Sequence, residues 1–118
     1  MFQSVGDIAV FGLTGDLDLL EGRSLMRSLG RMIHHEWVKI VLDFERVEHV
    51  NYQVLAQLVR AAVVSHALQG RIKLANMTSY HRNLLRVAGV EEFFETYGSL
   101  GEAILSFADE FTSPTSPC

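Results

Sequence analysis

The sequence is poor in residues that crosslink a chain or carry it through a membrane. Cysteine occurs once, as Cys118 at the last position, so no internal disulfide forms and a small secreted scaffold is excluded. No apolar run approaches the roughly 20 residues that a membrane-spanning helix needs. Met1–Val10 lack the charged start and long apolar run of a signal peptide. We therefore expect a cytoplasmic protein with no direct membrane insertion.

Grouped positive charge is also missing along the sequence. Lysine and arginine total 10 against 14 aspartates and glutamates, which gives a formal net charge of −4. Nucleic-acid binding depends on grouped lysines and arginines that neutralise phosphates. The sequence therefore predicts no nucleic-acid partner.

What the chain does have is the composition of one folded domain. Its 118 residues are 48% hydrophobic and 20% charged, which is ordinary for a globular protein of common domain size. The last residues are rich in serine, threonine and proline. The sequence predicts one domain over residues 1–111, followed by a disordered tail over residues 112–118.

The spacing of apolar residues predicts strands that alternate with helices. The predicted strands are Phe2–Ser4, Ile8–Thr14, Trp37–Phe44, Arg71–Ala75 and Phe93–Tyr97. The predicted helices are Leu20–His35, Tyr52–Gln69, Tyr80–Ala88 and Leu100–Phe107. This order indicates an α/β fold with a mixed, mostly parallel sheet of four or five strands, packed with about four helices.

Capping residues set the expected boundaries of the second and third helices. A loop over Glu45–Val50 leads to Asn51, which is the expected N-cap of the second helix. Gly70 stands where glycine usually ends a helix. Ser79 is the expected cap of the third helix.

No local motif predicts catalysis, a cofactor or a metal site. Asp16-Leu17-Asp18 fails as a calcium loop because Glu21 stands where that loop needs glycine, so a polar loop that caps the first helix is the simpler interpretation. Adjacent His34 and His35 point in different directions on a helix and cannot share a metal. Cys118 has no base held near it. A catalytic site assembled from distant residues stays open.

Three segments, in order, resemble the STAS domain, the fold of bacterial anti-sigma-factor antagonists. They are Leu13–Asp18 before the first helix, Ile40–Val50 around the central strand, and Leu74–Ala103 with its leucine-rich helix and its Ser-Leu-Gly-Glu-Ala start of a closing helix. The resemblance covers nearly everything from Ile8 to Phe107. It implies a STAS-like fold and a regulatory module that binds another protein, with no enzymatic activity and no cofactor.

The start of the second helix departs from the family pattern. In phosphorylatable members this helix opens with Asp-Ser-Ser-Gly, and a partner kinase, which is also the anti-sigma factor, phosphorylates a serine there. The corresponding residues here are Asn51, Tyr52, Gln53 and Val54. Tyr52 falls at the phosphoacceptor position, with its hydroxyl farther out on a rigid ring. We therefore expect no phosphorylation at this position, and a partner that is bound constitutively or controlled from outside.

The resemblance also indicates where a partner would bind. The implied partner-binding residues are Asp16, Asp18, Asn51, Tyr52, Gln53 and Val54. The implied partner is an anti-sigma factor or a serine-kinase-like regulator, and a homodimer is open as well. Tyr52 either offers an exposed aromatic anchor, of the kind enriched in interface hot spots, or packs back on the domain against His49 or Leu55.

Two other functions stay open at this stage. A STAS subunit of a membrane lipid-transport complex docks on a transporter without a phosphate switch, and the missing serine favours it. A binder of a small molecule or nucleotide near Asp16 and Asn51 requires a concave site with converging polar groups.

Overall fold

A computed structural model gives the backbone of residues 2–112 and the side chains of residues 2–108. The strands are β1 (Phe2–Val5), β2 (Ile8–Leu17), β3 (Lys39–Val50), β4 (Arg71–Ala75) and β5 (Glu95–Tyr97). The helices are α1 (Leu19–His34), α2 (Tyr52–Ala67), α3 (Ser79–Val87) and α4 (Leu100–Thr112), with a 3-10 turn at Glu91–Phe93. Thr112 therefore ends α4, while the rest of the predicted tail, residues 113–118, lies outside the described residues.

The strands form one sheet in the order β1-β2-β3-β4-β5. Strand β1 pairs antiparallel with β2, and the other three pairings are parallel. The prediction of a mixed, mostly parallel sheet is confirmed, and the sheet has five strands where four or five were expected.

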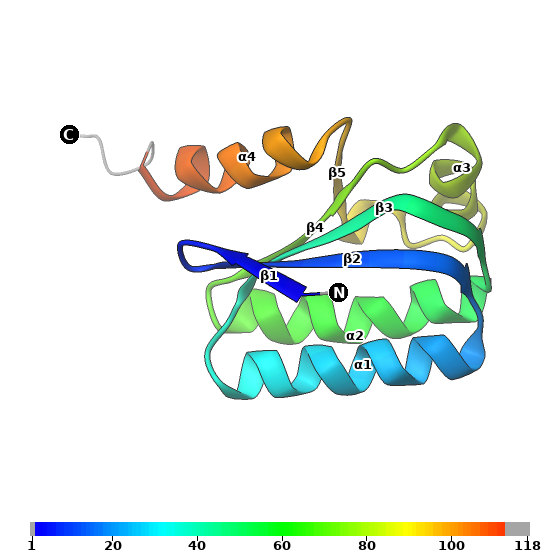
Figure 1. Cartoon of the computed structure of the whole chain (residues 1–118), viewed down its shortest axis with the longest axis horizontal. Coiled ribbons are helices and arrows are strands. Elements are labelled where there is room, and N and C mark those ends of the chain that lie inside the picture. The colour runs from blue at the N-terminus through cyan, green and yellow to red at the C-terminus, as the bar shows by residue number, and fades with distance from the viewer. Residues whose placement is uncertain (1, 113–118) are drawn as a thin grey trace.

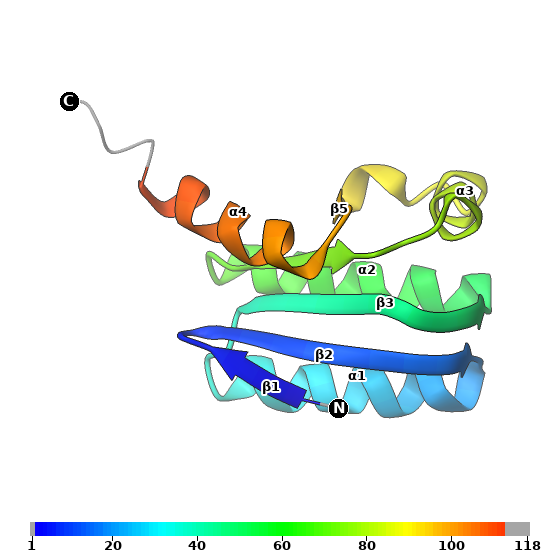
Figure 2. The same cartoon turned by 45° about the horizontal axis from the view of Figure 1, so that its top comes forward.

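Helices cover the two faces of the sheet unequally. Figures 1 and 2 show α1 and α2 side by side on one face, α4 on the other, and α3 beyond the carboxyl end of β4. Parallel crossovers are right-handed, and the sheet grows in one direction from β2 to β4. Both crossover helices therefore fall on the same face, which brings their N-termini to the same end of the sheet.

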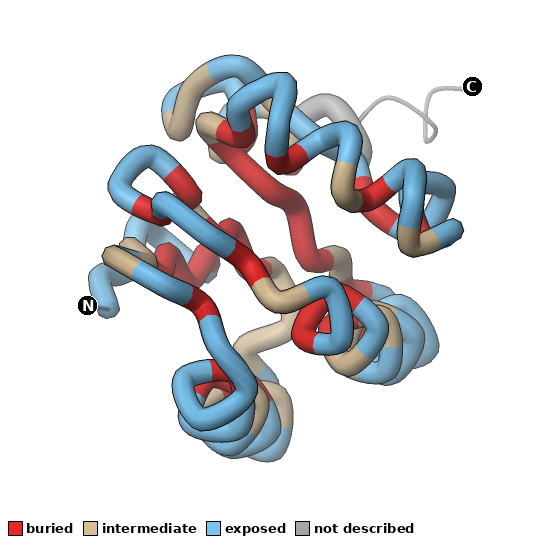
Figure 3. Tube along the Cα trace, turned by 90° about the vertical axis from the view of Figure 1, so that its right-hand side faces the viewer, coloured by how far each residue is buried: buried red, intermediate tan, exposed pale blue. Residues whose placement is uncertain are grey.

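The hydrophobic core has two parts because side chains of a strand alternate between the faces. On β3, Ile40, Leu42 and Phe44 are fully buried in the larger part, under α1 and α2. Val41, between them, belongs to the smaller part that Ala103 and Phe107 of α4 cover. Figure 3 views the molecule from one end and shows buried positions of the strands, in red, between the helices.

The predicted loop at Glu45–Val50 is wrong. Strand β3 continues to Val50 and stays paired with β2 as far as Leu17, because two register shifts accommodate extra residues in the ladder. The carboxylate of Asp43 supports the first shift: its Oδ1 accepts hydrogen bonds from the Glu45 backbone N (3.0 Å) and from Nδ2 of Asn76 (3.0 Å). The longer strands carry the site residues to the end of the sheet.

Two boundaries of the other helices also differ from the expectation. The cap of α3 is Thr78 rather than Ser79: Thr78 Oγ1 accepts from the His81 backbone N (3.1 Å), and the Thr78 backbone N donates to Nδ1 of His81 (3.3 Å). After α2 the residue with positive φ is Gln69 (70°), so Gly70 does not supply the left-handed conformation. The reason for glycine at position 70 is its close packing against the backbone of Val38.

A buried lysine joins α4 to the sheet. The Lys73 side chain is 1% exposed, and its Nζ donates to Ser106 Oγ of α4 (2.8 Å) and lies 3.2 Å from Oε1 of Glu95. The same Nζ stands 4.4 Å from the centre of the Phe107 ring. Charged and aromatic partners compensate the loss of water around the ammonium group.

Acid is expected to weaken this junction. Burial by itself raises the pKa of Glu95, but hydrogen bonds from Tyr97 and Lys73 outweigh it, so the pKa lies below its usual value. A carboxyl whose folded-state pKa is lowered stabilises the fold above its unfolded-state pKa and loses that contribution as pH falls through the folded-state pKa. We expect Glu95→Gln to be less stable than wild type by about 0.5–1 kcal/mol at about pH 7, because Glu95 is half exposed.

Urea unfolding at about pH 7 and about pH 3 measures this difference, which should shrink at the lower pH. Glu92→Gln is the matched control, because Glu92 is exposed and makes no ion pair with a described residue. An equal loss of stability for Glu95→Gln at both pH values would contradict the assignment.

Candidate functional site

The candidate site lies where β2 and β3 end and α1 and α2 begin. Leu17 and Val50 are the last paired residues, and the Asn51 backbone N donates to the Leu17 carbonyl (2.9 Å). This end is on the right in Figure 1. The sequence placed the partner-binding residues on two segments far apart in the chain, and the fold brings these segments together.

Two polar side chains cap the helices at this end. Oδ1 of Asp18 accepts from the Glu21 backbone N (2.9 Å) at the start of α1. Oδ1 of Asn51 accepts from the Gln53 backbone N (2.8 Å) at the start of α2. Both residues thus have the capping role expected of their residue types. Because helix N-termini carry partial positive charge, the carboxylate of Asp18 is also favourably placed at the start of α1.

The three residues that open α2 differ in accessibility. Tyr52 is 60% exposed and Gln53 is exposed. Of the two residues named for the alternative in which Tyr52 packs back on the domain, Leu55 is fully buried, and His49 places its ring against Tyr80. Most of the Tyr52 surface therefore remains available to a partner.

Val54 lies in the core instead of on the surface. Its side chain is fully buried against α1, where a Cβ added to Gly22 would come within 2.7 Å of Val54 Cγ2. A side chain with no exposed surface cannot touch a partner directly. Val54 acts at this site by fixing how closely the first turns of the two helices pack.

His49 and Tyr80 extend the site beyond the residues that the sequence indicated. His49 lies opposite Asp16 in the β2–β3 pairing, and its ring meets the Tyr80 ring edge-on at 6.4 Å between centroids. Tyr80, in the first turn of α3, is 51% exposed. His49 and Tyr80 are 31 positions apart in the chain, so no local motif marks their contact. We use "partner surface" for the accessible residues at this end: Asp16, Asp18, His49, Tyr52, Gln53 and Tyr80.

The described residues offer no metal cluster and no membrane-spanning helix. No three histidines, aspartates or glutamates among them are grouped so that they could hold a metal ion. His34 and His35 do meet, with ring centroids 5.3 Å apart, but at the far end of α1 from the partner surface. Within residues 2–112, no helix is both long and apolar enough to cross a membrane.

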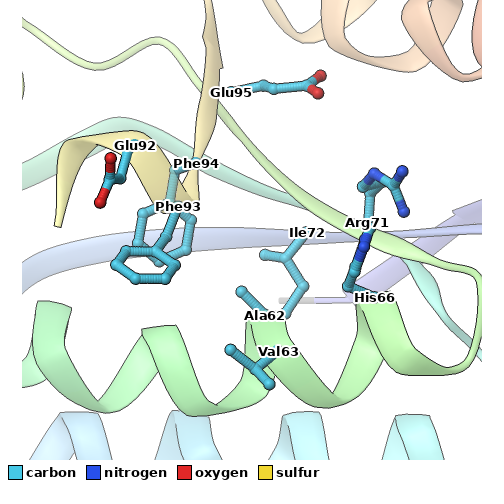
Figure 4. A pocket seen from close by; sticks show the side chains of 9 residues that line it. All are labelled: Ala62, Val63, His66, Arg71, Ile72, Glu92, Phe93, Phe94 and Glu95. Atoms are coloured by element: carbon cyan, nitrogen blue, oxygen red, sulfur yellow. The ribbon is translucent and has the colours of Figure 1, made fainter.

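A hollow of about 380 Å³ opens between α2 and the segment that leads into β5. Figure 4 shows Ile72 and Phe93 with the side chains of Ala62 and Val63 below them, and Arg71 and His66 to one side. Neither Asp16 nor Asn51 lines this hollow, so it is not the ligand site that the sequence left open near those residues.

The chain belongs to the STAS domain family. A family model described as "Mlab, STAS domain" matches residues 1–101, which include every residue of the partner surface and all five strands. No curated protein sequence matches the chain.

Solved structures share the fold at low sequence identity. An anti-sigma factor antagonist from Mycobacterium paratuberculosis has a TM-score of 0.82 at 17% identity, with 92% of each chain covered. The anti-sigma factor antagonist SpoIIAA in its unphosphorylated form has a TM-score of 0.80 at 19% identity, covering 92% of this chain and 95% of that one. Phosphorylated SpoIIAA of Bacillus has a TM-score of 0.70 at 20% identity, covering 91% and 99%.

Proposed function

We propose that this protein is a regulatory protein-binding module of the anti-sigma-factor-antagonist type, and that it has no enzymatic activity. The observation that carries the proposal is Tyr52, a large aromatic side chain that is 60% exposed at the first turn of α2. Exposed aromatic residues that become buried on binding are the commonest interface anchors. The partner is an anti-sigma factor or a serine-kinase-like regulator, and the protein acts in the cytoplasm.

The residues of the partner surface are suited to an interface with a protein rather than to a catalytic centre. Its carboxylates Asp16 and Asp18 are exposed, and Asp18 already accepts a backbone hydrogen bond. Its rings, those of Tyr52, His49 and Tyr80, offer apolar area with polar edges. Such a mixture supports docking of a protein, and no hydrogen bond among these six side chains pairs a base with a nucleophile, as catalysis needs.

Replacement of serine by Tyr52 removes the phosphate switch of the family. A phosphate brings about −1.5 to −2 charges at pH 7, and at a helix start it changes the affinity of an interface. A kinase that positions a serine hydroxyl close to the backbone does not reach a hydroxyl on the far side of an aromatic ring. Partner binding here is therefore constitutive or is controlled by the availability of the partner.

Tyr52→Ala is expected to weaken binding of the partner by about 2 kcal/mol, because truncation removes the anchor. Immobilised wild type and variant are incubated with native lysate, recovered proteins are identified by mass spectrometry, and the purified partner is titrated by calorimetry. Phe93→Ala is the matched control, since Phe93 is an exposed aromatic residue outside the partner surface. Equal affinity of the wild type and Tyr52→Ala would remove Tyr52 as the anchor.

The variant Tyr52→Ser separates this proposal from the second candidate, a STAS subunit of a membrane lipid-transport complex. Phosphate that appears only on the serine variant, together with recovery of a serine-kinase-type anti-sigma factor, supports an antagonist that cannot be switched. The second candidate is favoured by the same tyrosine, because docking on a transporter needs no phosphate. Recovery of transporter subunits would decide in its favour.

A further inference from the structure

Positive charge is concentrated on the outer helical layer of this acidic protein. Helices α1 and α2 together contain four arginines and one glutamate, Glu21, although the formal net charge of the chain is −4. The sequence shows no basic cluster, because these arginines are spread over two helices and are never adjacent.

Three of the arginines surround one hollow between α1 and α2. Arg23 and Arg27 are one turn apart on α1, and Arg60 stands on α2. Met26 and Gln57 complete the lining of the hollow, whose volume is about 390 Å³. None of the three arginines makes an ion pair with another described residue. Guanidinium groups without counter-charges repel one another and favour an anionic occupant. We call this hollow the arginine groove.

We propose that the arginine groove binds an acidic segment of the partner protein, so that one partner covers both the groove and the partner surface. This inference rests on the proposed function, whose partner it describes chemically. The two surfaces adjoin along α2: exposed Gln53 of the partner surface and Gln57 of the groove are four residues apart, on the same side of the helix.

A peptide fits the groove better than a simple anion does. The positive charges of the groove are spread out: Arg23 and Arg27 are one turn apart on α1, and Arg60 stands on α2. Carboxylates spaced along a peptide can each meet a different guanidinium group, whereas a single phosphate ion carries its charge in one place. The glutamate side chains meet the guanidinium groups in the paired geometry that arginine and carboxylate prefer.

A titration with defined probes tests the arginine groove in the full chain. The isotope-labelled protein is titrated by NMR with a helical peptide that carries glutamates four residues apart, and with the same peptide carrying glutamines. Inorganic phosphate and phosphatidylglycerol vesicles are titrated separately. We expect the glutamate peptide to shift the signals of α1 and α2, and added salt to weaken its binding.

The variants replace charge without changing size greatly. Combining Arg23→Gln, Arg27→Gln and Arg60→Gln should weaken binding of the glutamate peptide by about tenfold. Arg46→Gln, on β3 and facing the side of α4, is the matched control and should bind like wild type. Each single variant is measured too, so that a folding defect of the triple variant does not hide the result.

Three results would overturn the inference: equal binding of the two peptides, an unchanged affinity of the arginine variants, or binding of phosphate or vesicles in preference to the glutamate peptide. Tyr52-dependent recovery of a partner is measured in a different assay. If the glutamate peptide binds but no partner is recovered through Tyr52, the proposed function is wrong. If a partner is recovered through Tyr52 but the peptide does not bind, only the inference about the arginine groove is wrong.

Discussion

Substitution of Gly70 by alanine is expected to destabilise the protein by about 3 kcal/mol, because the added methyl group has no room. A Cβ at this position would overlap the carbonyl oxygen and carbon of Val38, at the start of the central strand. The same carbonyl oxygen accepts from Ser65 Oγ (2.7 Å) and from the Arg71 backbone N (2.9 Å). Moving it breaks both bonds and leaves the hydroxyl of Ser65, which is fully buried, without its partner.

Gly30→Ala provides a control with the same chemical change and the opposite expected sign. Gly30 is exposed in α1, and a Cβ added there meets nothing within 4 Å. Alanine in a helix interior is favoured over glycine by about 1 kcal/mol, so Gly30→Ala should raise stability. Urea unfolding measures both variants. A Gly70→Ala protein as stable as wild type would mean that the backbones of Val38 and Gly70 separate easily.

The second large effect concerns the contact between the first turns of α1 and α2. Gly22→Ala should destabilise the protein by about 1–3 kcal/mol, because its Cβ would stand 2.7 Å from Val54 Cγ2 and 3.3 Å from Cγ1 in a packed core. Valine is branched at Cβ and has few rotamers to escape into. To relieve this overlap, α1 and α2 must move apart at the turn of α2 that also carries Tyr52 and Gln53.

A double-mutant cycle identifies the cause. Val54→Ala alone opens a cavity and destabilises, but in the Gly22→Ala background it removes the overlap, so the two changes should couple favourably by about 1 kcal/mol. Unfolding of the four proteins in urea gives the coupling energy. Additive effects would show that Gly22 is required for a reason other than contact with Val54.

The same pair explains part of the departure from the family motif. The resemblance aligns Val54 with the glycine of the phosphorylatable motif, and in the structure Val54 fills the space that the missing side chain of Gly22 leaves. A small residue on α1 thus permits a large one on α2. Tyr52 and Val54 therefore have different places in the structure, one at the surface and the other in the packing beneath it.

Periodicity predicted the elements of this fold well because most of them bury a regular face. Ile40 and Leu42 of the predicted central strand and Leu55 and Leu58 of the second predicted helix are buried in one core cluster. The end of β3 was missed because register shifts place Val47 and Val50 in the core at a spacing of three residues. A bulge depends on pairing with the neighbouring strand and on the hydrogen bonds of Asp43. The spacing of apolar residues within one segment carries no information about either.

The candidate site was predictable only where capping chemistry is local. Asp18 and Asn51 bond to backbone groups two or three residues away, so their sequence context was sufficient. The contact of His49 with Tyr80 joins residues that are 31 positions apart, and the arginine groove joins two helices. Both depend on the packing of elements that are not consecutive in the chain.

Neighbouring strands of this sheet are also consecutive in the chain, which has a consequence during synthesis. A chain that leaves the ribosome from its N-terminus forms the β1–β2 hairpin first, and each later strand finds its partner at an edge that already exists. The layer of α1 and α2, with the surface around Tyr52, is complete once β4 has been added. The opposite face, where Lys73 lies, stays open to water until α4, which is made after β5, closes over it.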